Sequence, residues 1–226
     1  RNSLPMNVRS PDAASIAAYE QDGYFFPYDV TGEAEAAALL ADLEAAEAEL
    51  GGDRARISLL RTYPAQLLPS FAGLIRHPRL IEAVSRVIGP DVLMWSCGFF
   101  IKEPGSKSYV SWHQDLNYWG LDGDREITAW YALTPATVEN GCMRFVPGSH
   151  RRKDVAHVDK FAPDNLLTRG QEIAVEVDEA AAVNVLLRAG QASFHHGHMF
   201  HASGPNGTSS RRLGVAIRFI APSMKQ

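Results

Sequence analysis

The residues best suited to chemistry in this chain are a short motif and two remote partners. His113 and Asp115 stand two positions apart, His201 lies far downstream, and Arg212 follows eleven residues later. Side chains two positions apart on an extended segment project to the same side, so the first pair can reach one metal ion. Two imidazoles and one carboxylate are the ligands typical of non-haem Fe(II). The pattern therefore predicts an iron site with open coordination positions.

Length and composition limit the kind of protein that carries this site. The chain has 226 residues, 46% hydrophobic and 21% charged, which is enough for one substantial core and too apolar for disorder. We expect one domain, residues 1–226. The net charge of −4 argues against a nucleic-acid or anionic-membrane partner, since such binders normally carry a basic excess. A small-molecule substrate is the better expectation.

The sequence shows no recognisable targeting segment and no cysteine pattern typical of a metal site or a disulfide framework. No basic start leads into a short apolar block, and no apolar run approaches about 20 residues, so we expect a soluble cytoplasmic protein. The sequence leaves open the oligomeric state and whether residues 1–5 are native. Cys97 and Cys142 lie in strand-like segments and are expected to be buried as small apolar side chains.

The elements that must position the site fall into a helical first part and a strand-rich second part. Helical periodicity, caps and terminal glycines predict helices over about 10–21, 31–50 and 77–87. Short β-branched and aromatic runs then predict strands near 92–102, 109–113, 126–134, 142–146, 172–177, 183–187, 191–196, 199–203 and 213–220. Asn140-Gly141 and Ala189-Gly190 predict hairpins. Residues 150–170 are expected to form a long loop over the mouth of the sheets.

Three blocks of this sequence resemble one known family. They are Trp112-His113-Gln114-Asp115, the run from Gly141 to His150, and His201-Ala202-Ser203-Gly204-Pro205-Asn206 followed by Arg212. In order and approximate spacing they are similar to the phytanoyl-CoA dioxygenase family of Fe(II)/2-oxoglutarate-dependent oxygenases. The opening segment Tyr19 to Phe26 is also similar, so the resemblance covers almost the whole chain.

The resemblance implies both a fold and an anchored cosubstrate. The fold would be mainly β with flanking α-helices, a double-stranded β-helix (jelly roll, cupin-like), with helices at about 10–90 on a core at about 91–221. His113, Asp115 and His201 would be the catalytic metal ligands. Arg212 and Ser203 would hold the distal carboxylate of 2-oxoglutarate, because a planar guanidinium meets a carboxylate with two hydrogen bonds.

Further contacts are implied with less direct support from the motifs. Trp130 or Tyr131 would line the cosubstrate pocket, and Arg61 would supply an additional basic contact. The implied reaction consumes O2 and 2-oxoglutarate, releases succinate and CO2, and hydroxylates a C–H bond. Asp115 favours hydroxylation, because related halogenases have a small residue in place of this carboxylate.

Residues around the motif are candidates for substrate binding. Asn117 and Tyr118 beside the metal block, and Arg144 on a later strand, either contact substrate or belong to the rim and surface. His195, His196 and His198 precede His201, and we expect them to be packed or hydrogen-bonded rather than ligands.

Two other functions remain open at this point. A zinc- or manganese-dependent non-oxidative enzyme could use the same three ligands, although Arg212 and Ser203 would then have no obvious task. A non-catalytic jelly-roll binding module is the other. The sequence does not identify the substrate, since one fold hosts many reactions.

Overall fold

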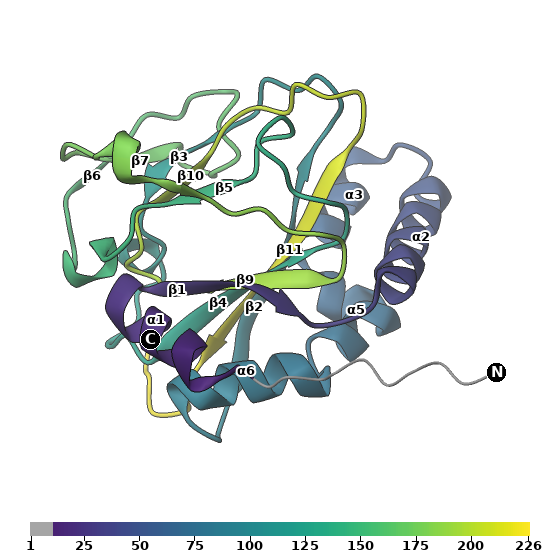
Figure 1. The fold of residues 1–226 in the computed structure, drawn as a ribbon. Helices are drawn as coiled ribbons and strands as arrows, with labels where there is room; N and C mark the ends of the chain where they lie inside the picture. The colour runs from purple at the N-terminus through teal and green to yellow at the C-terminus, as the bar shows by residue number, and fades with distance from the viewer. Residues whose placement is uncertain (1–10) are drawn as a thin grey trace.

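Two antiparallel sheets face each other, and helices cover the outer face of the larger one, while the motif follows a strand of the smaller one (Figure 1). This computed structural model describes residues 11–226, so Arg1–Pro5 and the expected helix start at Ser10 lie outside the described residues. The sheet-rich architecture with flanking helices agrees with the sequence-based expectation. Within the described residues, no helix is both long enough and apolar enough to cross a bilayer.

The structure confirms the three predicted helices, and the described residues form three more. In chain order they are α1 (Ala13–Asp22), α2 (Glu33–Glu49), α3 (Arg54–Thr62), α4 (Pro64–Leu67), α5 (Pro69–Leu74) and α6 (Pro78–Ile88). Asp12 caps α1, where its side chain accepts a hydrogen bond from the backbone of Ser15 at 2.9 Å. The unpredicted α4 and α5 are too short for periodicity to reveal, and each begins with a proline at its first position.

The larger sheet has the strand order β1 (Tyr24–Asp29), β9 (Gln191–His195), β4 (Glu126–Ala132), β11 (Arg212–Ile220) and β2 (Leu93–Lys102). All seven residues of β4 are buried. Ile127, Ala129 and Tyr131 pack in the core shared with the helices, while Thr128 and Trp130 point the other way. This sheet is therefore covered on one face by helices and on the other by the smaller sheet.

The smaller sheet has the strand order β3 (Val110–His113), β10 (His201–Ser203), β5 (Met143–Phe145) and β8 (Val183–Asn184). Phe145 and Met143 of β5 pack with Trp130 of β4 in a second apolar cluster between the sheets. Cys97 and Cys142 are buried and free, as predicted.

Both predicted hairpins are wrong. Asn140-Gly141 lies between β4 and β5, and Ala189-Gly190 lies between β8 and β9, so each turn carries the chain from one sheet to the other. The turn-forming character of the glycines was recognised correctly, since both adopt positive φ. Their sequence could not show that the strands on either side pair with different neighbours.

The segment 150–170 is not wholly irregular. It contains β6 (His157–Asp159), which pairs with β7 (Gln171–Ile173) beyond it. Short 3₁₀ helices occur at η1 (Leu116–Tyr118), η2 (Ser149–Arg151) and η3 (Glu179–Ala181). The side-chain amide of Gln114 donates to the carbonyls of Arg152 and His198, both at 2.8 Å, which ties this segment to the motif.

Gly141 gives a test of this packing. Its φ is +76°, and an added Cβ would lie 2.2 Å from the carbonyl oxygen of Gly204, so we expect Gly141→Ala to lower the free energy of unfolding by about 2–3 kcal/mol. Gly51→Ala is the matched control, because Gly51 has φ +56° and open space around it. It should cost only about 1 kcal/mol. Urea unfolding measures both, and equal losses would contradict the packing described.

Candidate metal centre

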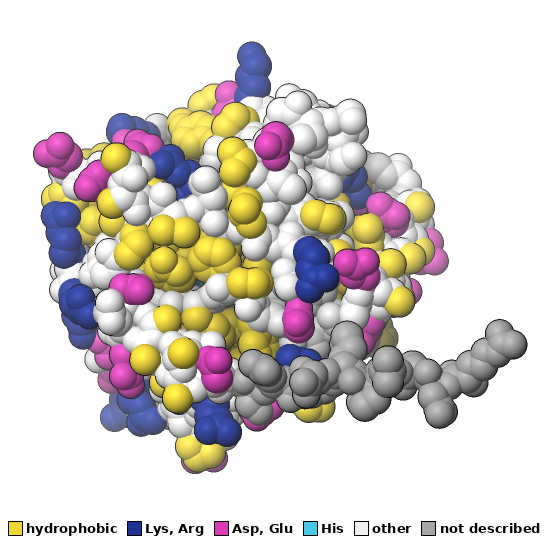
Figure 2. Space-filling model, viewed as in Figure 1, with side chains coloured by type: hydrophobic (Ala, Val, Ile, Leu, Met, Phe, Trp, Pro, Cys, Tyr) yellow, Lys and Arg dark blue, Asp and Glu magenta, His cyan; other side chains and the backbone are white. Residues whose placement is uncertain are grey.

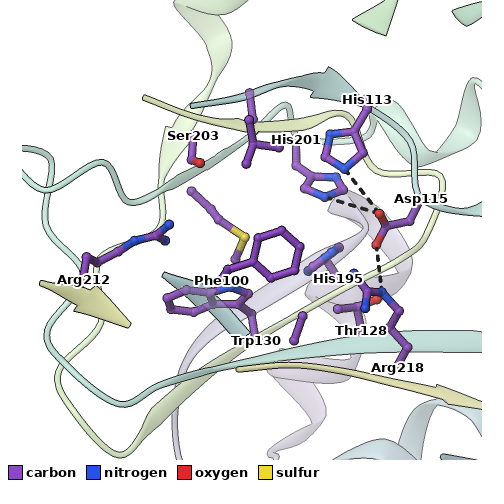
Figure 3. A pocket seen from close by; sticks show the side chains of 14 residues that line it. Phe100, His113, Asp115, Thr128, Trp130, His195, His201, Ser203, Arg212 and Arg218 are labelled. Carbon is purple, nitrogen blue, oxygen red and sulfur yellow. Dashed lines mark ion pairs between the residues drawn. The ribbon is translucent and has the colours of Figure 1, made fainter. Parts of the chain in front are cut away.

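Three metal-binding side chains converge at the end of the smaller sheet (Figure 3). His113 ends β3, His201 begins β10, and the two are partners in the antiparallel register. Asp115 follows β3, just before η1. Its Oδ1 lies 3.3 Å from Nε2 of His113 and 4.0 Å from Nε2 of His201. The three ligand atoms lie within 4.8 Å of one another, so a single ion can contact all three.

The backbone fixes which imidazole nitrogen faces the shared point. Nδ1 of His113 lies 2.9 Å from the carbonyl of Ser111, and Nδ1 of His201 lies 3.0 Å from the carbonyl of Met199. Since a carbonyl can only accept, each Nδ1 carries the proton and donates it. Each Nε2 is then left with a lone pair aimed at the shared point, as metal-ligating histidines require.

Electrostatics also favour metal binding. Burial alone would raise the pKa of Asp115, but the contact with His113 and the charge of Arg218 hold that pKa well below its usual range. Nε of Arg218 lies 3.7 Å from Oδ2 of Asp115. Burial, together with neighbouring His113, lowers the pKa of His201 well below its ordinary value. The site thus presents an ionised carboxylate and a neutral imidazole, the forms that bind a cation.

The donor set fits a divalent transition metal. Two imidazole nitrogens and one carboxylate oxygen would hold an ion from one side and leave its other side open to the cavity between the sheets. Such a facial arrangement with open positions is typical of Fe(II) oxygenases.

The cavity beside the triad is lined by both sheets and encloses about 420 Å³, counted to its open mouth. Phe100 of β2, Trp130 of β4 and Met143 of β5 supply apolar walls. On the face of the molecule shown in Figure 2, hydrophobic side chains gather where the two sheets part. The polar side chains of the cavity lie in two groups, one around Arg212 and one near Asp115 (Figure 3).

Arg212 forms one end of the cavity. It is 1% exposed, its guanidinium carbon lies 5.1 Å from the centroid of the Trp130 ring, and burial lowers its pKa to about 10. Nε and Nη1 have no hydrogen-bond partner among residues 11–226. A buried guanidinium without a partner is costly, so this geometry suits an anion that enters the cavity. Ser203 also lines this cavity.

Lys102 is a basic residue that sequence reasoning missed. It is fully buried at the end of β2 and is the register partner of Arg212. Its Nζ donates to Oγ of Ser203 at 2.7 Å and to the carbonyl of Gly204. Burial and the charge of Arg212 lower its pKa to about 6. A lysine that ends an otherwise mostly apolar run was the available signal.

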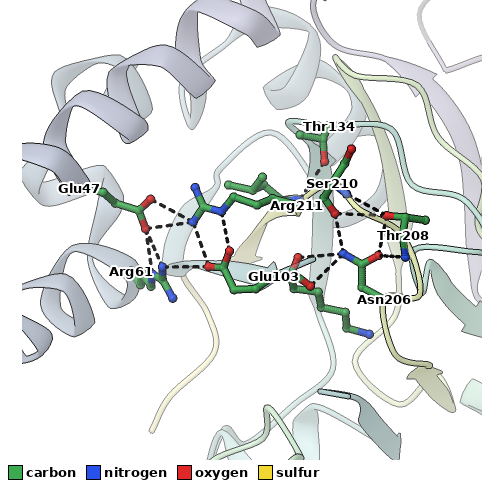
Figure 4. A network of polar contacts seen from close by, with 10 residues as sticks. Glu47, Arg61, Glu103, Thr134, Asn206, Thr208, Ser210 and Arg211 are labelled. Atoms are coloured by element: carbon green, nitrogen blue, oxygen red, sulfur yellow. Dashed lines mark hydrogen bonds and ion pairs between the residues drawn. The ribbon is translucent and has the colours of Figure 1, made fainter. Parts of the chain in front are cut away.

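The placement of Arg61 as a cosubstrate contact is corrected. Its guanidinium pairs with Glu47 at 2.7 Å and with Glu103 at 3.5 Å, in a network that also includes Arg211 (Figure 4). Arg61 does not line the cavity. Arg211 therefore faces this network while Arg212 faces the cavity, because consecutive strand residues point to opposite faces.

Tyr131 also faces away from the cavity. Its hydroxyl lies 2.6 Å from Oγ1 of Thr31, in the core beneath the helices. Trp130 lies on the opposite face of β4 and lines the cavity. Of the two aromatic candidates, the structure therefore leaves Trp130 beside the site.

The three candidate substrate contacts lie outside the cavity. Asn117 donates to the carbonyl of Val155 at 3.0 Å, and the ring of Tyr118 packs edge-on against His157. Both therefore brace the 150–170 segment. Arg144 points away from the cavity because its neighbours Met143 and Phe145 point inward, and its guanidinium pairs with Glu179 at 2.9 Å.

Of the three histidines that precede His201, one faces the cavity and two do not. His195 lines the cavity, with its ring centroid 4.7 Å from that of His201. His196 lies 3.5 Å from Glu126, outside the cavity. His198 stacks on His196.

Known proteins resemble this chain in both sequence and structure. Ectoine dioxygenase of Bordetella parapertussis is 30% identical over 157 residues, which are 62% of this chain and 50% of that protein. Human peroxisomal phytanoyl-CoA dioxygenase is 25% identical over 148 residues, 64% of this chain and 44% of that protein. The chain thus spans about half the length of these relatives.

A solved structure of the non-heme monooxygenase ThoJ superposes with a TM-score of 0.81 at 38% identity, covering 93% of this chain and 78% of that one. The sequence model of the family described as phytanoyl-CoA dioxygenase (PhyH) matches residues 19–214. Since that span is most of the chain and includes every ligand of the triad, the protein belongs to the phytanoyl-CoA dioxygenase family.

Proposed function

We propose that this protein is an Fe(II)- and 2-oxoglutarate-dependent dioxygenase that hydroxylates a small organic molecule. The observation that carries the proposal is the shared cavity, which joins the metal triad to a buried arginine without an anionic partner among the described residues. A metal alone explains the triad. An anionic cosubstrate beside the metal also explains Arg212.

His113, Asp115 and His201 would hold the iron. When bound, iron with 2-oxoglutarate and O2 supplies C–H hydroxylation coupled to formation of succinate and CO2. Arg212 would pair through its planar fork with the distal carboxylate of the ketoacid. Ser203 and Lys102, hydrogen-bonded to each other, would contact the same carboxylate. Trp130 would hold the ketoacid chain in place and exclude water.

We further propose that the fold is a double-stranded β-helix (jelly roll, cupin-like) in one domain over residues 1–226. Along the chain, β3, β4 and β5 alternate between the small and large sheets, and β8, β9, β10 and β11 do the same. Such alternation winds two facing sheets together.

The substrate is expected to be small. The cavity of about 420 Å³, counted to its open mouth, must hold both the cosubstrate and the reacting part of the substrate. We retain the expectation of a cytoplasmic protein without nucleic-acid or membrane partners. A zinc or manganese hydrolase, or a non-catalytic binding module, does not by itself require an anion at Arg212, whereas the 2-oxoglutarate reaction does.

The metal site can be tested through one ligand. Under anaerobic conditions, Fe(II) and 2-oxoglutarate should give a weak visible charge-transfer band, and admitting O2 should release succinate. His113→Ala should abolish both signals, because two remaining ligands hold iron poorly. His77→Asn is the control, since His77 caps α6 far from the triad and Asn preserves the cap. Full succinate formation by His113→Ala would refute the assignment.

The cosubstrate anchor can be tested with adjacent arginines. Arg212→Lys keeps a positive charge but loses the fork, so KM for 2-oxoglutarate should rise about 10- to 100-fold, measured by succinate formation. Arg211→Lys should leave that KM unchanged, because Arg211 pairs with Glu47 and Glu103 at the surface. If the two variants gave the same KM, Arg212 would not be the anchor.

A further inference from the structure

A row of three polar side chains crosses the larger sheet at the metal end of the cavity. Arg218 of β11 is the register partner of Thr128 of β4, which is the partner of His195 of β9. Register partners on neighbouring strands project to the same face. All three side chains line the cavity, close to the triad (Figure 3).

The row is rich in polar atoms that the protein leaves unsatisfied. Oγ1 of Thr128 and both ring nitrogens of His195 have no hydrogen-bond partner among residues 11–226, and Nε of Arg218 has only the ion pair with Oδ2 of Asp115 at 3.7 Å. Thr128 and His195 are each 1% exposed. Buried polar atoms are normally paired, so a cluster of unpaired ones at a cavity wall indicates a ligand. Whichever tautomer it adopts, the imidazole of His195 carries at least one N–H donor.

This row is separate from the cosubstrate anchor. Arg212 and Arg218 stand at opposite ends of the cavity wall formed by β11, six residues or about 20 Å of strand apart. Gly214 and Ala216 lie between them on the same face and leave room above the strand. The ring of Trp130 fills the space over Gly214, where a Cβ would lie 1.9 Å from it.

Charge indicates which ligand the row prefers. The sum of charges in the occupied cavity rests on the proposed function, because it includes a divalent ion and a dianionic ketoacid. The ion is balanced by the ketoacid, and Asp115 balances one of the two arginines, Arg212 and Arg218. Lys102 is not counted, since burial and the charge of Arg212 lower its pKa to about 6. One positive charge is left over in a buried cavity, which favours a monoanion.

We propose that Thr128, His195 and Arg218 bind a carboxylate of the substrate, so that the substrates of this enzyme are small monocarboxylic acids. Arg218, Thr128 and His195 each offer a donor to the carboxylate oxygens. The neighbouring rings of Phe100 and Trp130 pack against the hydrocarbon part. Asp115, 3.7 Å from Arg218, holds the carboxylate-binding group beside the metal.

The experiment titrates butyrate, and butyramide as its uncharged counterpart, into the Fe(II)- and 2-oxoglutarate-loaded protein without O2. Calorimetry gives the affinity, and the visible charge-transfer band reports the metal environment. Butyrate should bind at least tenfold more tightly than butyramide and should shift the band. Thr128→Val should weaken butyrate binding about tenfold, because it removes one donor to a charged acceptor while keeping the branched shape.

Ser193→Ala is the matched control. Ser193 also lies on β9 with a buried, unpaired hydroxyl, but it does not line the cavity, so butyrate affinity should be unchanged. Equal affinities for butyrate and butyramide, an unaffected Thr128→Val protein, or displacement of 2-oxoglutarate by butyrate would each overturn the inference. A wild-type protein that forms no band overturns the proposed function itself, whereas a band that butyrate leaves unshifted overturns only the carboxylate site.

Discussion

The antiparallel pairing of β3 with β10 is the constraint on which the site depends. It sets His113 opposite His201, although 88 positions separate them in the sequence, and Asp115 then follows at the strand end. A shift of this register by one residue would turn either histidine to the other face of the sheet. The carbonyls of Ser111 and Met199 complete the arrangement by fixing both imidazole tautomers.

The remaining architecture keeps the charged cavity beside the β3–β10 pair buried. Helices cover the outer face of the larger sheet, so β4 is buried on both sides and β11 almost so. Charged groups on the inner face are consequently held in a medium that screens them poorly. Arg218 compensates the ionised Asp115, whereas Arg212 has no anion among the described residues, and this difference separates the metal end of the cavity from the end where the cosubstrate is proposed to be anchored.

Sequence patterns predicted the elements and motifs whose signals are local. The helices with clear periodicity, most strands and the family blocks containing His113 and His201 were found in this way. The prediction that Arg61 contacts the cosubstrate was wrong, because its partners Glu47 and Glu103 come from separate segments of the chain. The prediction that Arg144 contacts the substrate was wrong, because the sequence of a three-residue strand does not show which of its side chains point inward.

Lys102 and the row of Thr128, His195 and Arg218 were missed for a related reason. Their association depends on strand register, to which no single stretch of sequence points. The most direct test of the account is anomalous diffraction from crystals of the protein grown with Fe(II) under anaerobic conditions. The account predicts an iron peak within bonding distance of Nε2 of His113, Nε2 of His201 and Oδ1 of Asp115. Iron bound elsewhere, or Nε2 of His201 turned away from that peak, would contradict it.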